Sequence, residues 1–162
     1  MKYRFNPWLA LLLCLTLLTG CGANPKLEEY KMNMETFYSD ISTYDTIINS
    51  IDVNSDTAVL ELLSALDGLE ERFTWMASLE IPGEFASVEN LATEAGEYMS
   101  SAVELYHQAY EGETFDAALA EAAKEHYDRA NKRALYILAV LHGEMPEELM
   151  EVSEDTTDSD AP

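Results

Sequence analysis

Residues 27–51, LEEYKMNMETFYSDISTYDTIINSI, contain the pattern that decides the fold. Apolar side chains recur there at intervals of three and four residues, at Leu27, Tyr30, Met34, Phe37, Ile41, Tyr44, Ile48 and Ile51. This spacing places all of them on one face of an α-helix, which is then buried against neighbouring helices. Asn24 and Pro25, which precede the pattern, are typical of the first residues of a helix. The stretch therefore predicts a helix over about 25–51.

Three more stretches with the same spacing follow, and turn residues separate them. The first of these ends before Ile81-Pro82-Gly83, the next is closed by Gly112, and the last is stopped by Gly143. The predicted helices span about 56–80, 84–111 and 114–142. Helices of similar length joined by short turns pack as antiparallel neighbours. Residues 25–143 are therefore predicted to form an all-α, up-down-up-down four-helix bundle.

The turn at Gly112 predicts which residues of the third and fourth helices lie level with each other. The level pairs are Val88 with Ile137, Ala95 with Ala130, Tyr98 with Tyr127, and Ala102 with Ala123. Because alanine meets alanine in two of these pairs, we expect the two helices to approach closely. Across the first turn, the same reasoning places Phe73 level with Met34.

The C-terminal residues 144–162, EMPEELMEVSEDTTDSDAP, differ in composition from the helices. They contain eight acidic residues, no Lys or Arg and no aromatic residue. Such a segment buries too little apolar surface to order itself. We expect an acidic, mostly disordered tail in which Leu149, Met150 and Val152 touch the bundle.

The N-terminus has the features of a signal peptide. Lys2 and Arg4 make the first four residues positively charged, and an apolar run of eleven residues follows from Trp8 to Leu18. A membrane-spanning helix needs roughly 20 such residues, so this run is too short to be a permanent anchor. We expect residues 1–20 to be removed as a signal peptide.

The residues Leu18-Thr19-Gly20-Cys21 resemble the lipobox of bacterial prolipoproteins. This resemblance implies that Cys21 is lipidated, becomes the mature N-terminus, and is joined to the bundle by a tether over 21–24. The protein would then be lipid-anchored on the outer face of a bacterial membrane, at the outer membrane if the host has two. Cys14 would leave with the signal peptide, so Cys21 has no cysteine partner for a disulfide. The alternative is an ordinary secretory signal that ends in Gly-Cys.

The charge of the chain excludes one class of partner. The sequence has 31 acidic residues and nine Lys and Arg, and two of the nine lie in residues 1–20. The mature chain then has seven cations and 31 acids, a formal net charge of −24. Nucleic-acid binding depends on cations that meet phosphates, so we expect no nucleic-acid partner.

No motif in the helices identifies a reaction, a metal or a cofactor. Glu104 and His107 have the Glu-x-x-His spacing of di-iron bundles, but this motif occurs once and points away from the core stripe. His126 and His142 have no Glu three residues before them. We therefore expect no enzymatic activity, no metal site and no cofactor.

Two features of the helices are candidates for binding. The first is a layer of tyrosines in the bundle centre, Tyr44, Tyr98 and Tyr127, which suits a small ligand if it lines a cavity. The second is the stretch 134–141, ALYILAVL, which is apolar all round and must be covered. It contains Leu135, Tyr136 and Leu138, and Trp75 lies at a similar height on the second helix.

These observations lead to two hypotheses. We expect a lipid-anchored protein-interaction module at the cell surface that uses the apolar patch and binds another protein or a second copy. The alternative is a small-ligand or metal-binding lipoprotein that uses the tyrosine layer. A cavity lined by the three tyrosines would favour the alternative.

Overall fold

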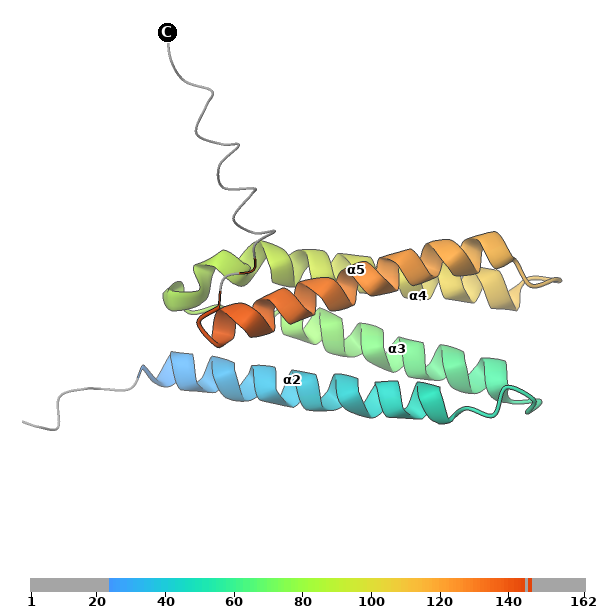
Figure 1. The fold of residues 1–162 in the computed structure, drawn as a ribbon, viewed down its shortest axis with the longest axis horizontal. Coiled ribbons are helices and arrows are strands. Elements are labelled where there is room, and N and C mark those ends of the chain that lie inside the picture. The colour runs from blue at the N-terminus through green and yellow to red at the C-terminus, as the bar shows by residue number, and fades with distance from the viewer. Residues whose placement is uncertain (1–23, 145, 147–162) are drawn as a thin grey trace, which may run out of the picture.

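The computed structural model describes residues 24–144 and 146 (Figure 1). Its α-helices are α2 (Pro25–Ser50), α3 (Ala58–Ala77), α4 (Glu89–Glu111) and α5 (Ala117–Leu141), and a 3₁₀ helix, η2 (Gly83–Val88), precedes α4. The described part contains no strand, and the prediction of an all-α four-helix bundle is confirmed. The expected signal peptide 1–20, Cys21 and all of the expected tail except Glu144 and Pro146 lie outside the described residues.

The helices begin and end close to the predicted positions, with differences at two turns. The second helix stops at Ala77 instead of residue 80, and the third begins as η2, in which Phe85 has non-helical angles (φ −117°, ψ 21°). Pro82 is extended and its carbonyl accepts the Phe85 N–H at 2.8 Å, which forms the tight 3₁₀ turn. The fourth helix begins at Ala117, because the Asp116 side chain accepts the N–H groups of Ala118 and Leu119.

The chain reverses direction between successive helices, as Figure 1 shows. Between α3 and α4, Asp67 contacts His107 and Glu70 contacts Ser100, so residue numbers rise in one helix as they fall in the other. Between α2 and α5, Tyr38 contacts Ala134 and Asp45 contacts Tyr127 in the same opposed order. Pairs of this kind are those of antiparallel neighbours.

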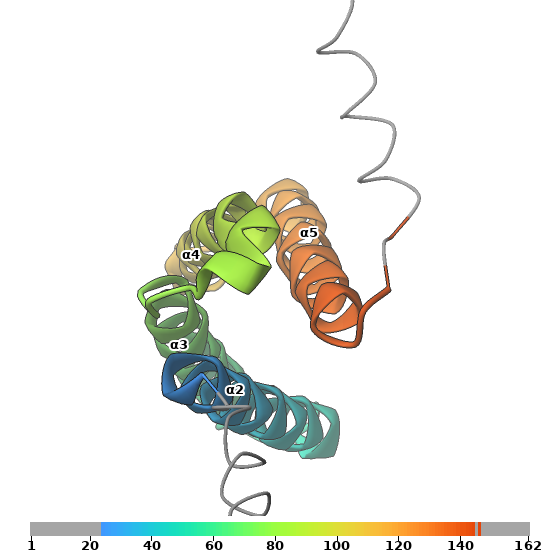
Figure 2. The ribbon, with the colours of Figure 1, turned by 90° about the vertical axis from the view of Figure 1, so that its left-hand side faces the viewer.

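The four helices are arranged as an open arc in chain order (Figure 2). The contact between α4 and α5 is the most extensive in the bundle, followed by α3 with α4 and α2 with α3. In the view along the bundle, α2 and α5 are the two ends of the arc and stand apart. The bundle is therefore packed unevenly, with one side more open than the others.

The core is centred in the half of the bundle that contains the start of α2. Phe37 and Phe73 are fully buried there, and their rings meet edge to face with centroids 5.1 Å apart. In α2 the fully buried positions end at Phe37, and Ile41, Tyr44 and Ile48 are only half-buried. The far half of α2 thus contributes less to the core than its first half.

The alanines that were predicted to lie between α4 and α5 are buried. Ala95 and Ala102 of α4 and Ala123 and Ala130 of α5 are all fully buried. The register of α2 against α3 differs from the prediction, because the Phe73 ring meets Phe37, about one helical turn beyond the predicted Met34, and Arg72 pairs with Asp40. The connection between these helices is longer than expected, since α3 begins at Ala58 rather than residue 56.

Candidate functional site

A groove lies between α2 and α5, the two helices at the ends of the arc. Met34 and Tyr38 of α2 line it from one side, and Leu138 and Leu141 of α5 from the other. Its volume is about 240 Å³, and its rim residues are Lys31, Glu35 and His142. The groove therefore has an apolar floor with charged and polar groups at its edge, which we call the α2–α5 groove.

Tyr38 connects the two walls of the α2–α5 groove by a hydrogen bond. Its hydroxyl donates a hydrogen bond to the Ala134 carbonyl of α5 at 2.7 Å. Burial of the phenol, with Tyr30 nearby, raises the pKa of Tyr38 well above its usual range. The hydroxyl therefore stays protonated and acts as a hydrogen-bond donor at neutral pH.

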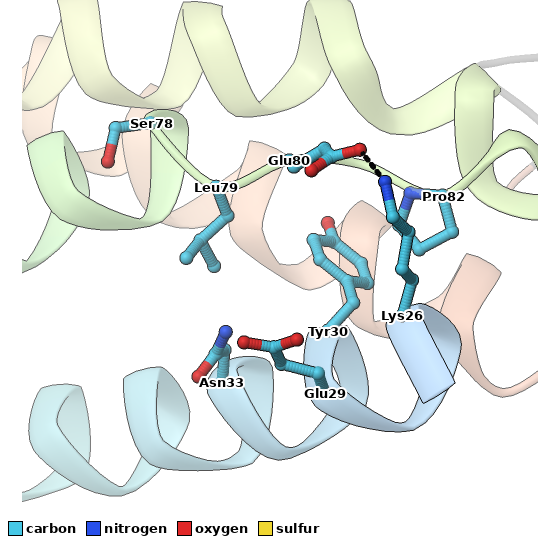
Figure 3. A pocket seen from close by; sticks show the side chains of 8 residues that line it. All are labelled: Lys26, Glu29, Tyr30, Asn33, Ser78, Leu79, Glu80 and Pro82. Atoms are coloured by element: carbon cyan, nitrogen blue, oxygen red, sulfur yellow. Dashed lines mark hydrogen bonds and ion pairs between the residues drawn. The ribbon is translucent and has the colours of Figure 1, made fainter. Parts of the chain in front are cut away.

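A second, more polar pocket of about 210 Å³ lies between the first turns of α2 and the chain that joins α3 to η2 (Figure 3). Leu79 points toward α2, and the Tyr30 phenol rises from α2 toward the connecting chain. Lys26 forms an ion pair with Glu80 across its mouth, and the Glu80 hydrogen bond raises the Lys26 pKa. Tyr30 is only 2% exposed, and its burial raises its pKa to about 12.

The polar pocket marks the end of the bundle where α2 begins. There the Asn24 side-chain amide donates to the Glu84 carboxylate at 3.0 Å, which lowers the Glu84 pKa. The α2–α5 groove also opens toward this end, since His142 at the end of α5 lines it with Lys31. We call this the Asn24 end of the bundle.

The structure does not bring the predicted tyrosine layer together. The Tyr44 ring packs against α3, where it occupies the space that a Cβ on Gly68 would need. The Tyr127 hydroxyl donates to the Asp45 carboxylate of α2 at 3.1 Å. Burial raises the pKa of Tyr127 to about 12. These two tyrosines therefore contact different helices.

Tyr98 faces charged side chains instead of the other two tyrosines. The guanidinium carbons of Arg129 and Arg133 both lie 5.8 Å from its ring centroid, and the His126 ring lies 5.9 Å away. Arg133 also pairs with Glu94 on α4. This cluster joins α4 to α5 as a set of cation–π and ionic contacts.

The residues of the predicted apolar patch lie on two helices that do not adjoin. Trp75 is on α3, half-buried, with the Arg72 guanidinium 5.9 Å from its ring. Tyr136 is on α5, with the Lys132 ammonium 5.4 Å from its ring, and its buried hydroxyl has no hydrogen-bond partner among the described residues. Figure 2 shows α3 and α5 across the arc from each other.

The α5 part of the patch belongs to the groove. Leu138 lines the α2–α5 groove, and Leu135, one helical turn earlier, is 62% exposed. Both leucines were predicted from the sequence, but Met34 and Tyr38 were not predicted as their counterparts on α2. Tyr38 follows the core residue Met34 by four residues, which is a signal that the apolar face of α2 is wider than the core stripe.

His107, the histidine of the Glu-x-x-His spacing, contacts two carboxylates. Its Nε2 lies 2.8 Å from Asp67 of α3, and its Nδ1 lies 3.0 Å from Glu111. The hydrogen bond with Asp67 is the main cause of its raised pKa. Across residues 24–144 and 146, no group of three or more His, Cys, Asp or Glu side chains is placed to hold a metal ion.

Among the described helices, none is both long and apolar enough to span a membrane. No protein-family model, no curated protein and no solved structure matches the chain.

Proposed function

We propose that this protein is a lipid-anchored, extracytoplasmic helical bundle that binds another protein. The observation that carries the anchoring is the sequence Leu18-Thr19-Gly20-Cys21 behind a short apolar run, which resembles a lipobox. Two acyl chains on one cysteine hold a protein stably at a membrane, whereas one chain holds it only marginally. The formal charge of −24 keeps the surface of the mature chain solvated and opposes binding to nucleic acids.

The tether would orient the bundle on the membrane. Only three residues, Gly22, Ala23 and Asn24, separate Cys21 from the first residue of α2, and three extended residues reach at most about 11 Å. A lipidated Cys21 would therefore hold the Asn24 end close to the bilayer. The turns near Val53 and Gly112 would face outward, about 40 Å away.

The α2–α5 groove supports protein binding more than small-ligand binding. It is an open groove between two helices that stand apart, and Leu135 beside it is exposed. Recognition of an apolar segment in a groove between helices is a common mode of protein interaction. The alternative, a ligand held by Tyr44, Tyr98 and Tyr127, lacks support because these side chains make separate contacts.

The Cys21→Ser substitution tests the anchor. We expect it to abolish metabolic labelling by an alkyne fatty acid and to release the protein from the membrane fraction, because serine provides no thiol for the lipid. The matched control is Cys14→Ser, which lies in the expected signal peptide and should keep full labelling. Labelling that survives Cys21→Ser would refute the proposed anchor.

Site-specific photocrosslinking in living cells tests the binding role. A photoreactive residue at Leu135 is expected to yield a discrete crosslinked product, while one at Val53, which is 83% exposed at the far end, should not. A product of twice the protein's own mass would identify a second copy as the partner. No discrete product at Leu135, or equal products at both positions, would count against an interaction at this surface.

A further inference from the structure

The polar pocket at the Asn24 end contains a buried hydroxyl that the described part of the chain leaves unbonded. Tyr30 is 2% exposed, yet it lines this pocket, and its phenol rises from α2 toward the chain that joins α3 to η2 (Figure 3). Across residues 24–144 and 146, no group forms a hydrogen bond with its hydroxyl. Because a buried polar group without a partner costs free energy, this hydroxyl favours a ligand that bonds to it.

The charged groups of the pocket leave one carboxylate in excess. Lys26 is the one cation that lines it, and Glu29 and Glu80 are its two carboxylates. Lys26 forms its ion pair with Glu80, whereas Glu29 has no ion pair within the described residues. Glu29 acts on Lys26 only as a nearby charge, which contributes to the raised Lys26 pKa. The net charge of −1 favours a cationic ligand.

The other groups of the pocket favour a cation that donates hydrogen bonds. Figure 3 shows the Glu29 and Asn33 side chains pointing toward each other on the side of α2 from which Tyr30 rises. A carboxylate, an amide oxygen and a phenol oxygen all accept hydrogen bonds, and a primary ammonium group has three N–H donors. Leu79 and the buried Pro82 add apolar surface for the carbon atoms next to the ammonium.

We propose that the polar pocket binds the primary ammonium group of a small amine, with Glu29 supplying the opposite charge and Tyr30 a hydrogen bond. This site is separate from the α2–α5 groove, and it does not depend on the lipidation of Cys21. The ammonium group has two sources, a dissolved amine or the ethanolamine headgroup of a membrane lipid. The second source rests on the proposed anchor, which would hold the Asn24 end close to the bilayer.

Ligand-observed NMR with ethanolamine tests the site in protein purified from expressing cells in deuterated detergent micelles. We expect saturation transfer to ethanolamine, and little to choline, whose quaternary ammonium has no N–H. Glu29→Gln removes the charge and Tyr30→Phe removes only the hydroxyl, so each should weaken ethanolamine binding about fivefold or more. The matched controls are Glu28→Gln, an exposed neighbour outside the pocket, and Tyr110→Phe on α4, and both should bind like the parent.

The controls separate a built site from diffuse attraction to an acidic surface. Equal binding by Glu29→Gln and Glu28→Gln, or equal binding of choline and ethanolamine, would overturn the proposal. Circular dichroism of each variant shows that it remains folded.

Reconstitution in vesicles distinguishes the two sources of the ammonium group. In vesicles of phosphatidylcholine alone, the protein should bind added ethanolamine. If phosphatidylethanolamine in the vesicles abolishes that signal, the headgroup occupies the pocket. If the signal is unchanged, the pocket takes a dissolved amine. No ethanolamine signal in either kind of vesicle would count against the site.

Discussion

Phe73→Ala is expected to lower the free energy of unfolding by about 3–5 kcal/mol. Phe73 is fully buried in the centre of the core, and its ring meets Phe37 of α2 edge to face. Truncation removes the apolar surface of the ring and leaves a cavity in the core. Domains of this size have a total stability of about 5–15 kcal/mol, so the loss is a large share of it.

Thermal unfolding followed by circular dichroism measures this effect, and Phe115→Ala is the matched control. Phe115 is 56% exposed, and its ring packs against that of Tyr110 with centroids 4.9 Å apart. We expect less than about 1 kcal/mol from the control. Equal destabilisation by the two substitutions would show that Phe73 does not sit in the core.

Ala130→Phe is expected to destabilise the bundle by about 1–3 kcal/mol or more. Ala130 is fully buried on α5, in the contact with α4 that also buries Ala95. The alanines allow the two helices to approach closely, and a benzyl group at this position would force them apart. Because this is the most extensive contact in the bundle, the strain would extend along both helices.

The control for overpacking is Ala118→Phe in the first turn of the same helix. Ala118 is exposed, so the ring can extend into solvent and the melting temperature should change little. Chemical denaturation of both variants gives the difference in unfolding free energy. An unchanged midpoint for Ala130→Phe would refute the close approach of α4 and α5.

The helices and their buried faces could be predicted because they depend on residues that are close in the chain. The spacing of three and four residues identified Met34, Phe37 and Phe73 as core positions, and all three are fully buried. The alanine contact also followed from the short turn at Gly112. The register between α2 and α3 was less accurate, since it depends on the conformation of the turn between them and not on a periodic pattern.

The candidate site was predicted only in part. Leu135 and Leu138 were identified from the apolar stretch in α5, but their placement beside Met34 and Tyr38 was not predicted. Trp75 and Tyr136 were grouped by their height along the bundle. The position of a residue along the bundle axis does not predict which helices are neighbours. These two residues lie on helices that face each other across the arc.

The amino-acid sequence by itself determined the all-α class, the face that each helix buries, the strong negative charge and the resemblance to a lipobox. Each of these is a property of composition or of spacing within a helical turn or two. Only the tertiary structure decided that α2 and α5 stand at the ends of an open arc with a groove between them. That groove depends on contacts such as Tyr38 with Ala134, which are 96 residues apart. More than one arrangement of the four helices would bury the apolar face of each helix. The arrangement that leaves this groove open is selected only when the side chains of all four helices pack together.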